Sequence, residues 1–173
     1  MFVGLMSCSD LSRPDQLQRL EILNDSIDSM EVLISESEPS DLDAMIQLSQ
    51  EVSGKFEQLG LDTIDYEFAI RLDRFKRMGT SCAKVKFSFE QQKLDLEEER
   101  TAVENLINDI NAGNGRRDKY DEYIAFEEEK VAKLSVRLNE YLDELNEAID
   151  AYDELSILLL SEINERSAQN EVQ

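Results

Sequence analysis

The sequence predicts an all-α fold, an elongated antiparallel helical hairpin of the coiled-coil type, on three observations. Apolar side chains recur every seven residues in two long runs, the spacing of a continuous buried seam between helices. A turn sequence, Ala112-Gly113-Asn114-Gly115, separates the two runs. Only 6 Gly and 2 Pro occur in 173 residues, which leaves little room for a turn-rich β fold. The first run is Phe68, Phe75, Cys82, Phe89, Leu96, Val103 and Ile110, and the second is Ile124, Val131, Leu138, Leu145, Tyr152 and Leu159.

Two shorter helices are expected ahead of the hairpin. Pro14 suits the first turn of one helix, where a missing N–H has no consequence, and Asp10 or Ser12 caps that helix. The second helix begins at Ser40, which has the capping-box spacing to an acidic residue, and Gly60 ends it. Their apolar faces are Leu20, Leu23, Ile27, Met30 and Ile34 in the first helix and Leu42, Met45, Val52, Phe56 and Leu59 in the second.

The two long helices form the arms of the hairpin. The first arm is expected over residues 64–112, with Asp62 or Thr63 as its cap. Gly79 lies inside this arm, but the apolar seam keeps its phase across the glycine. We therefore expect no break there. The second arm starts near Asp118, after the turn.

Folded around the turn, the arms form an antiparallel pair in which the numbers of facing residues add to about 230. This register places Phe89 against Tyr141. The two shorter helices are expected to pack as a hairpin on the base of the long one, away from the turn, in a three- or four-helix bundle. The turn end would then be a two-helix stalk, in which Gln92, Glu99 and Glu127 occupy wet seam positions.

The chain is expected to form one helical-bundle domain over residues 12–166. Residues 1–11 are interpreted as the remnant of a signal and a tether, and residues 167–173 as a flexible C-terminal tail. The longest aliphatic run, from Ile157 to Leu160, is far shorter than the roughly 18 apolar residues that span a bilayer. No transmembrane helix is predicted.

Composition argues against several functional classes. The formal net charge of −21 would repel phosphate backbones, so no nucleic-acid partner is expected. The chain has no His, which removes the commonest general base and the usual nucleophile systems. We expect no enzyme, no catalytic residue, no metal and no cofactor. The carboxylates at 97–99 and 127–129 are expected on solvated helix faces.

The two cysteines call for different interpretations. Cys82 lies on the seam and is expected to pack in the core. Cys8 ends the sequence Leu5-Met6-Ser7-Cys8, which resembles a bacterial lipobox, where a signal peptidase cuts before the cysteine and the cysteine is acylated. With the helical body that follows, the chain resembles the helical envelope lipoproteins of Bacteroidota and, more loosely, the cell-wall-binding lipoproteins of Gram-positive bacteria. The resemblance implies acylation of Cys8 and no ligand site. The alternative is an ordinary N-terminus with an incidental cysteine.

Two surfaces are candidates for binding. Beside the turn, cations accompany aromatic residues of the types that dominate interaction hot spots. The alternative is that the tyrosines cover the end of the coiled coil. The candidate partner-binding tip is Arg116, Arg117, Lys119, Tyr120 and Tyr123, with Phe126 beside it. The second surface is a basic island, which we expect acids of the first two helices to neutralise. The island is Arg71, Arg74, Lys76, Arg77, Lys84 and Lys86, and the acids are Asp25, Asp28, Glu31, Glu36 and Glu38.

These observations predict a non-enzymatic, lipid-anchored protein of the bacterial cell envelope, which serves as a rigid helical scaffold or interaction module. Its expected partners are a membrane, through the lipid on Cys8, and an envelope protein of unknown identity. The alternative is a soluble coiled-coil adaptor, cytoplasmic or secreted, that binds a partner helix or forms a homodimer.

Overall fold

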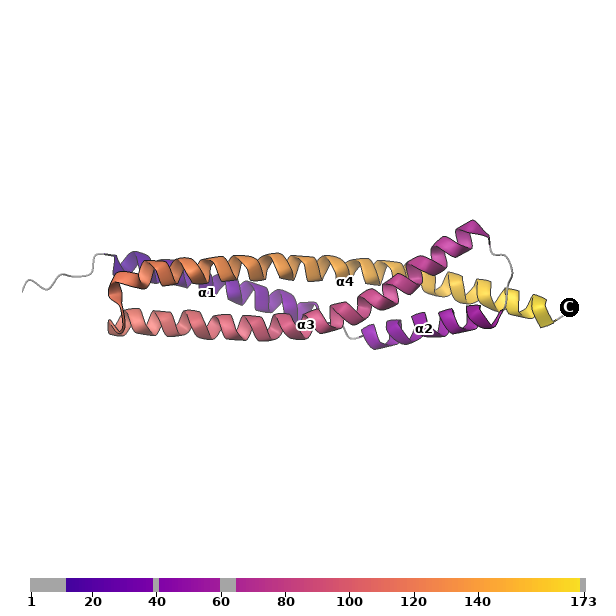
Figure 1. The fold of residues 1–173 in the computed structure, drawn as a ribbon, viewed down its shortest axis with the longest axis horizontal. Helices are drawn as coiled ribbons and strands as arrows, with labels where there is room; N and C mark the ends of the chain where they lie inside the picture. The colour runs from indigo at the N-terminus through magenta and orange to yellow at the C-terminus, as the bar shows by residue number, and fades with distance from the viewer. Residues whose placement is uncertain (1–11, 39–40, 60–64, 172–173) are drawn as a thin grey trace, which may run out of the picture. The chain divides into compact units, whose positions relative to one another are not determined.

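The computed structural model describes residues 12–38, 41–59 and 65–171, and these residues confirm the all-α prediction. The helices are α1 (Arg13–Glu36), α2 (Leu42–Gln58), α3 (Tyr66–Ala112), the short 3-10 helix η1 (Arg117–Lys119) and α4 (Tyr120–Glu171) (Figure 1). The described residues contain no strand, and none of their helices is long and apolar enough to cross a bilayer. Helix α4 continues into the predicted C-terminal tail, 167–173. Cys8, Ser40 and Gly60 lie outside the described residues.

The N-terminal cap of α3 differs from the prediction. The backbone N–H of Phe68 donates to Asp65 Oδ1 at 2.8 Å, and Arg166 donates to the other carboxylate oxygen at 2.6 Å. The hydrogen bond from Phe68, followed by the one from Arg166, lowers the pKa of Asp65. Asp65 therefore caps the helix, whereas the predicted caps Asp62 and Thr63 precede it and lie outside the described residues.

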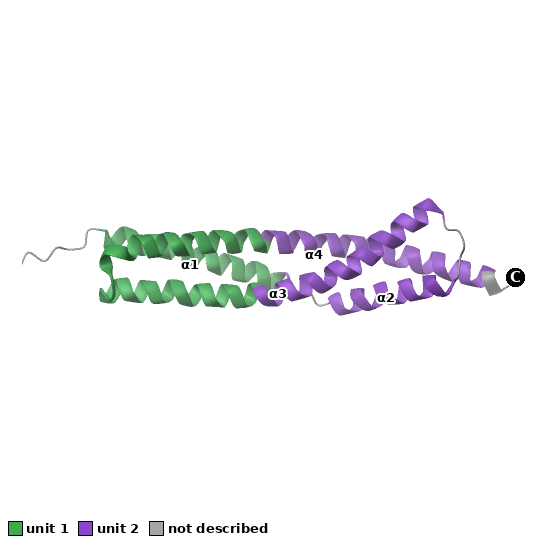
Figure 2. Ribbon diagram, in the orientation of Figure 1, with its two compact units in different colours: residues 1–36, 92–138 green, residues 37–91, 139–173 purple. Residues whose placement is uncertain are grey.

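The packing divides the chain into two compact units (Figure 2). Unit 1 comprises residues 1–36 and 92–138, and unit 2 comprises residues 37–91 and 139–173. Each unit is a three-helix bundle, because α3 and α4 contribute a segment to both, α1 belongs to unit 1 and α2 to unit 2. The expectation of one domain over residues 12–166 stays a prediction.

Helix α1 corrects the predicted arrangement, in which both short helices pack on the base. Arg13, the first residue of α1, donates to the backbone oxygen of Asn111 at 2.7 Å, one residue before α3 ends at the turn. The end of the hairpin near the turn is therefore a three-helix bundle rather than a two-helix stalk. Coverage of the seam explains this position, because a two-helix stalk would leave part of the seam near the turn in water, whereas α1 covers it with its own apolar face. The buried residues of α1 include Leu20, Leu23, Ile27, Met30 and Ile34.

Helix α1 in unit 1 and helix α2 in unit 2 both run antiparallel to α3. Along α1, Arg13 contacts Asn111 and Asp28 contacts Arg100, so the residue numbers rise in one helix as they fall in the other. Along α2, Asp43 contacts Lys86 and Ser49 lies against Gly79 in the same sense. The two arms also pair as predicted. The rings of Phe89 and Tyr141 lie 6.1 Å apart between centroids, which confirms the register in unit 2.

The turn between α3 and α4 depends on two glycines. Gly113 and Gly115 have φ of 69° and 73°, in the left-handed region that disfavours residues with a Cβ. The side chain of Arg117 folds back over Gly113, and its Nε donates to the Gly113 carbonyl oxygen at 3.0 Å. A Cβ on Gly113 would collide with this guanidinium group.

Gly79 lets α2 approach α3 closely. Helix α3 runs through this residue without a break, as predicted. A Cβ added to Gly79 would lie 2.5 Å from the Cβ of Ser49, a distance that real contacts do not reach. Ser49 is buried, and its hydroxyl donates to the carbonyl oxygen of Phe75 at 3.2 Å. The glycine therefore serves packing between helices rather than a kink.

We expect Gly79→Ala to lower the free energy of unfolding by about 1–3 kcal/mol, because the clash outweighs the gain of about 1 kcal/mol in helix propensity. Urea unfolding followed by circular dichroism measures the change. The matched control is Gly54→Ala in α2, where nothing lies within 4 Å of the new methyl group and a small gain in stability is expected. Adding Ser49→Gly to Gly79→Ala should restore part of the loss. Equal stability of the two alanine variants would contradict the close contact.

Candidate functional site

The predicted tip contains one residue that is part of the core. Tyr120 is buried, and its hydroxyl lies within hydrogen-bonding distance of the carbonyl oxygens of Asp109 and Asn114. It thereby ties the last turn of α3 to the loop. Tyr120 stands four residues before Ile124, which places it on the seam of α4, so its burial could have been predicted from the sequence.

The cations of the tip have partners close by in the chain. Arg116 pairs with Asp118 at 2.8 Å, Lys119 pairs with Glu122, and Arg117 donates to the Gly113 carbonyl oxygen. The side chains of the first pair are about two-thirds exposed, and such pairs contribute on the order of 1 kcal/mol or less. These cations can therefore exchange partners at little cost.

Two aromatic side chains next to the turn face solvent. Tyr123 is 43% exposed and Phe126 is 59% exposed, and their spacing of three places both on one side of α4. Lys130 Nζ lies 5.5 Å from the centroid of the Phe126 ring, within the range of a cation–π contact. We call Arg116, Arg117, Lys119, Tyr123 and Phe126 the turn surface. It differs from the predicted tip in that Phe126 takes the place of the buried Tyr120.

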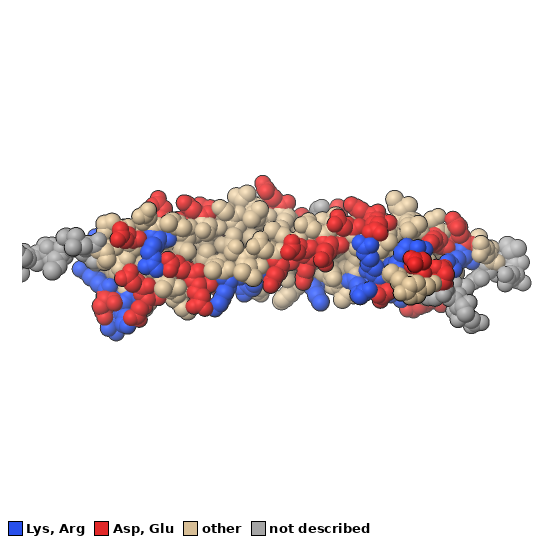
Figure 3. Space-filling view, turned by 90° about the horizontal axis from the view of Figure 1, so that it is seen from above, with Lys and Arg blue, Asp and Glu red and all other residues tan. Residues whose placement is uncertain are grey.

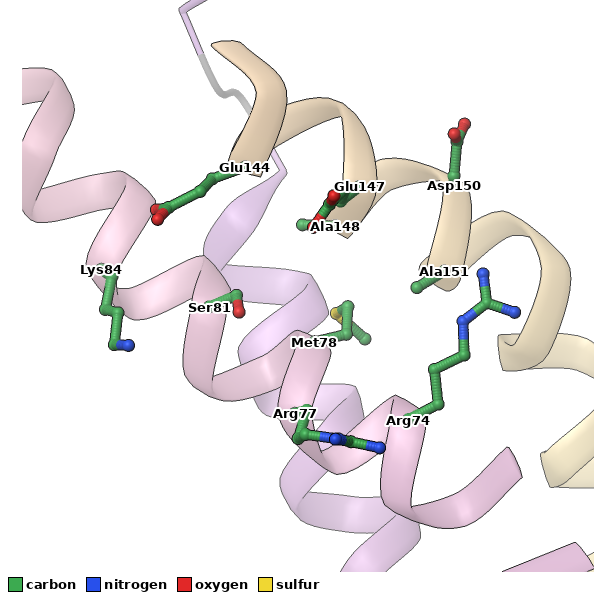
Figure 4. A pocket seen from close by; sticks show the side chains of 10 residues that line it. All are labelled: Arg74, Arg77, Met78, Ser81, Lys84, Glu144, Glu147, Ala148, Asp150 and Ala151. Carbon is green, nitrogen blue, oxygen red and sulfur yellow. The ribbon is translucent and has the colours of Figure 1, made fainter. Parts of the chain in front are cut away.

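A shallow groove of about 450 Å³ lies between α3 and α4 in unit 2 (Figure 4). Helix α3 supplies three cations to its lining, and α4 supplies three carboxylates. Glu144 extends across the groove toward α3, whereas Asp150 points away from it. A groove with both signs of charge has no marked preference for a cation or an anion. Its lining is Arg74, Arg77, Met78, Ser81, Lys84, Glu144, Glu147, Ala148, Asp150 and Ala151.

Part of the basic island pairs with other acids than those predicted. Arg71 pairs with Glu162 at 2.5 Å, Arg74 with Glu154 at 2.6 Å and Lys86 with Asp43 at 2.7 Å. Two of these three acids lie on α4. Asp28 and Glu31 of α1 bind Arg100 instead, because α1 packs in unit 1. Blue side chains lie next to red ones at several places on the face drawn in Figure 3.

Cys82 lies in the core, as predicted. Its side chain is fully buried, with Sγ 3.5 Å from Met78 Sδ and 3.9 Å from Met45 Sδ. Burial raises the pKa of the Cys82 thiol. A neutral thiol in this environment is unreactive, which favours a packing role.

A buried acid in unit 1 corrects the expectation of a wet seam and of solvated carboxylates. Glu99 is 2% exposed, and Lys130 Nζ lies 2.6 Å from its Oε2 and 2.8 Å from Glu127 Oε2. Gln92, another seam position, is also buried. The reason is the position of α1, which covers this part of the hairpin. Glu99 stands between Leu96 and Val103 on the seam, which is the signal for its burial.

The environment of Glu99 changes its acidity. Burial and the neighbouring Glu127 raise the pKa of Glu99 to about 7, against the opposing effect of Lys130. Burial lowers the pKa of Lys130, but its hydrogen bonds to Glu127 and Glu99 raise it above the ordinary value. The other Glu99 oxygen, Oε1, has no hydrogen-bond partner in the described part of the chain. Protonation near neutral pH would relieve the burial of this negative charge.

Comparison with protein-family profiles, curated proteins and solved structures gives no match for the chain. The turn surface combines cations with large apolar side chains in water. That combination is typical of contact surfaces for proteins and for membranes.

Glu99 predicts a pH dependence of stability. Because its pKa is higher in the folded than in the unfolded chain, the folded state binds more protons between the ordinary value of 4.5 and about 7. Stability should therefore fall as pH rises through this range. Glu99→Gln removes this effect, so it should stabilise the protein more at pH 8 than at pH 5, by about 1–3 kcal/mol.

Urea unfolding at both pH values measures this difference. The matched control is Glu98→Gln, since Glu98 lies next to Glu99 in the chain but is exposed. It should show no comparable pH-dependent gain. An equal response of the two variants would mean that Glu99 is ionised in the folded state without penalty.

Proposed function

We propose that the protein is a non-enzymatic helical scaffold of a bacterial cell envelope, anchored through a lipid on Cys8, that presents its helical body to another envelope protein. The observation that carries the proposal is the Leu5-Met6-Ser7-Cys8 pattern, which ends five residues before the first residue of α1. A cysteine this close to a packed helix would couple a lipid directly to the bundle.

Ion pairs between helices support a scaffold role. In unit 1, Arg19 of α1 donates through two nitrogens to the carboxylate of Glu128 on α4, at 2.8 and 2.6 Å. Arg100 of α3 bridges Asp28 and Glu31 of α1. Hydrogen bonds to these acids, Glu31 first, raise the pKa of Arg100. Bidentate pairs of this kind fix helix orientation as well as contributing energy.

Exposed apolar side chains in unit 2 are suited to a protein partner. Tyr66, Phe87 and Ile157 are 76%, 72% and 79% exposed, which leaves most of each side chain in water. Burial against a partner would recover roughly 25 cal/mol per Å² of apolar area. The same side chains would also serve a soluble coiled-coil adaptor. Acylation of Cys8 therefore distinguishes the lipid-anchored scaffold from the adaptor.

Cys8→Ser tests the anchor. Expressed behind a functional signal segment in a bacterial host, the parent should sediment with membranes and yield an acylated N-terminal peptide by mass spectrometry. Each buried methylene of the acyl chains contributes about 0.8 kcal/mol, so loss of acylation should release the protein or leave it unprocessed.

Cys82→Ala is the matched control, because it removes the other thiol from the core and should leave membrane partition unchanged. If the Cys8→Ser protein fractionates and migrates like the parent, the lipoprotein proposal fails. The coiled-coil adaptor then becomes the preferred function.

A further inference from the structure

The start of α1 is held beside the turn between α3 and α4. Arg13 donates to the backbone oxygen of Asn111 at 2.7 Å and lies 3.2 Å from its side-chain oxygen. One turn further along α1, the buried Gln16 donates to Asp121 at 3.1 Å. These contacts join α1 to the last turn of α3 and the first turn of α4, all within unit 1.

Chain length limits how far a lipid on Cys8 can lie from this point. Arg13 follows Cys8 by five residue steps, and a fully extended chain advances at most about 3.6 Å per step, so their Cα atoms lie within about 18 Å of each other. This distance is smaller than the roughly 30 Å thickness of the hydrocarbon core of a bilayer. An acylated Cys8 would therefore bring the turn close to the lipid headgroups.

The turn surface has the chemistry of a membrane-contacting surface. Aromatic rings such as those of Tyr123 and Phe126 are favoured at the boundary between headgroups and hydrocarbon, and Lys and Arg bind headgroup phosphates. Lys119 and Arg116 have their acidic partners on the exposed surface, so phosphate groups can compete for them.

Charge does not oppose this orientation. Residues 109–126 contain three cations and four carboxylates, a net charge of −1, whereas the whole chain has a net charge of −21. An anionic membrane would therefore repel this segment only weakly.

We infer that the turn surface rests on the lipid headgroups, so that the predicted partner-binding tip is the membrane-facing end of unit 1. This inference depends on the proposed acylation of Cys8. It assigns the turn surface to phospholipid rather than to a protein. Partner proteins would then meet other faces of the helices.

Fluorescence quenching on vesicles tests the orientation. The acylated full-length protein is reconstituted into phosphatidylcholine–phosphatidylglycerol vesicles that carry a headgroup nitroxide quencher. A fluorophore is attached to a cysteine introduced by Asn114→Cys at the turn or, as the matched control, by Val136→Cys. Val136 is exposed on α4 of unit 1, and sixteen residues of helix at 1.5 Å per residue place it about 24 Å along α4 from Tyr120. The label at position 114 should be quenched several-fold more strongly than the label at position 136.

A second pair of variants tests whether the turn surface contacts the headgroups. Phe126→Glu should reduce quenching of the label at position 114, because it places a carboxylate against anionic headgroups. Val136→Glu adds the same charge to an exposed apolar position on the same helix and should leave that quenching unchanged. Circular dichroism verifies that both variants remain folded.

The outcomes separate the two proposals. If the protein fails to float with vesicles, the acyl anchor is absent, and both the anchor and the orientation fail. If it floats through Cys8 but the label at position 114 is quenched no more than the label at position 136, the anchor holds and the orientation is wrong. The turn surface would then be free for a protein partner.

Discussion

The register between α3 and α4 is the constraint on which the packing of both units depends, and the turn between these helices sets it. Gly113 and Gly115 provide the positive φ angles that reverse the chain, and Tyr120 holds the closed turn from its buried side. The seven-residue spacing then carries this register along the helices. A shift of one residue would rotate each seam side chain by about 100° around its helix and remove it from the core. Glu99 with Lys130 in unit 1 and Phe89 with Tyr141 in unit 2 show the same register.

Polar residues in the seam make this register more specific. Glu99 is acceptable in the core of unit 1 because Lys130 reaches it from α4, and a different alignment would leave the carboxylate without this partner. A buried polar pair often contributes little net stability, yet it disfavours alternative alignments. Gly79 and Ser49 restrict α2 in another way, because only a residue without a side chain allows this approach. The charge of Glu99 and the small size of Gly79 thus select one alignment of the helices, which a repetitive apolar seam alone does not do.

The sequence was sufficient to predict the features that depend on local chemistry. Helix α3, its continuity through Gly79 and the pairing of Phe89 with Tyr141 follow from apolar spacing and from the turn. The position of α1 could not be predicted in this way. Helices α1 and α2 have similar apolar faces, and the choice between the two ends of the hairpin depends on which seam surface each helix buries. That is a contact between residues far apart in the chain.

The error in placing α1 propagated to the candidate sites. A two-helix stalk implies a wet seam, so Glu99 was expected in water and the acids of α1 beside the basic island. With α1 in unit 1, Glu99 is buried, and Asp28 binds Arg100. Residue type groups Tyr120 with its solvent-facing neighbours, although its spacing from Ile124 indicates the core. Cys8 lies outside the described part of the chain, so its acylation stays a prediction from the Leu5-Met6-Ser7-Cys8 pattern.

The interleaving of the two units has a consequence for synthesis on the ribosome. Unit 1 needs α1 together with segments of α3 and α4 that are translated much later, so its first helix emerges with an apolar face that has no partner yet. All segments of unit 1 are present once residue 138 has left the exit tunnel, whereas unit 2 also needs residues 139–173. Vectorial translation therefore favours completion of unit 1 first, although α2 of unit 2 is made before most of it. During that interval α1 and α2 are the segments most in need of a holding chaperone.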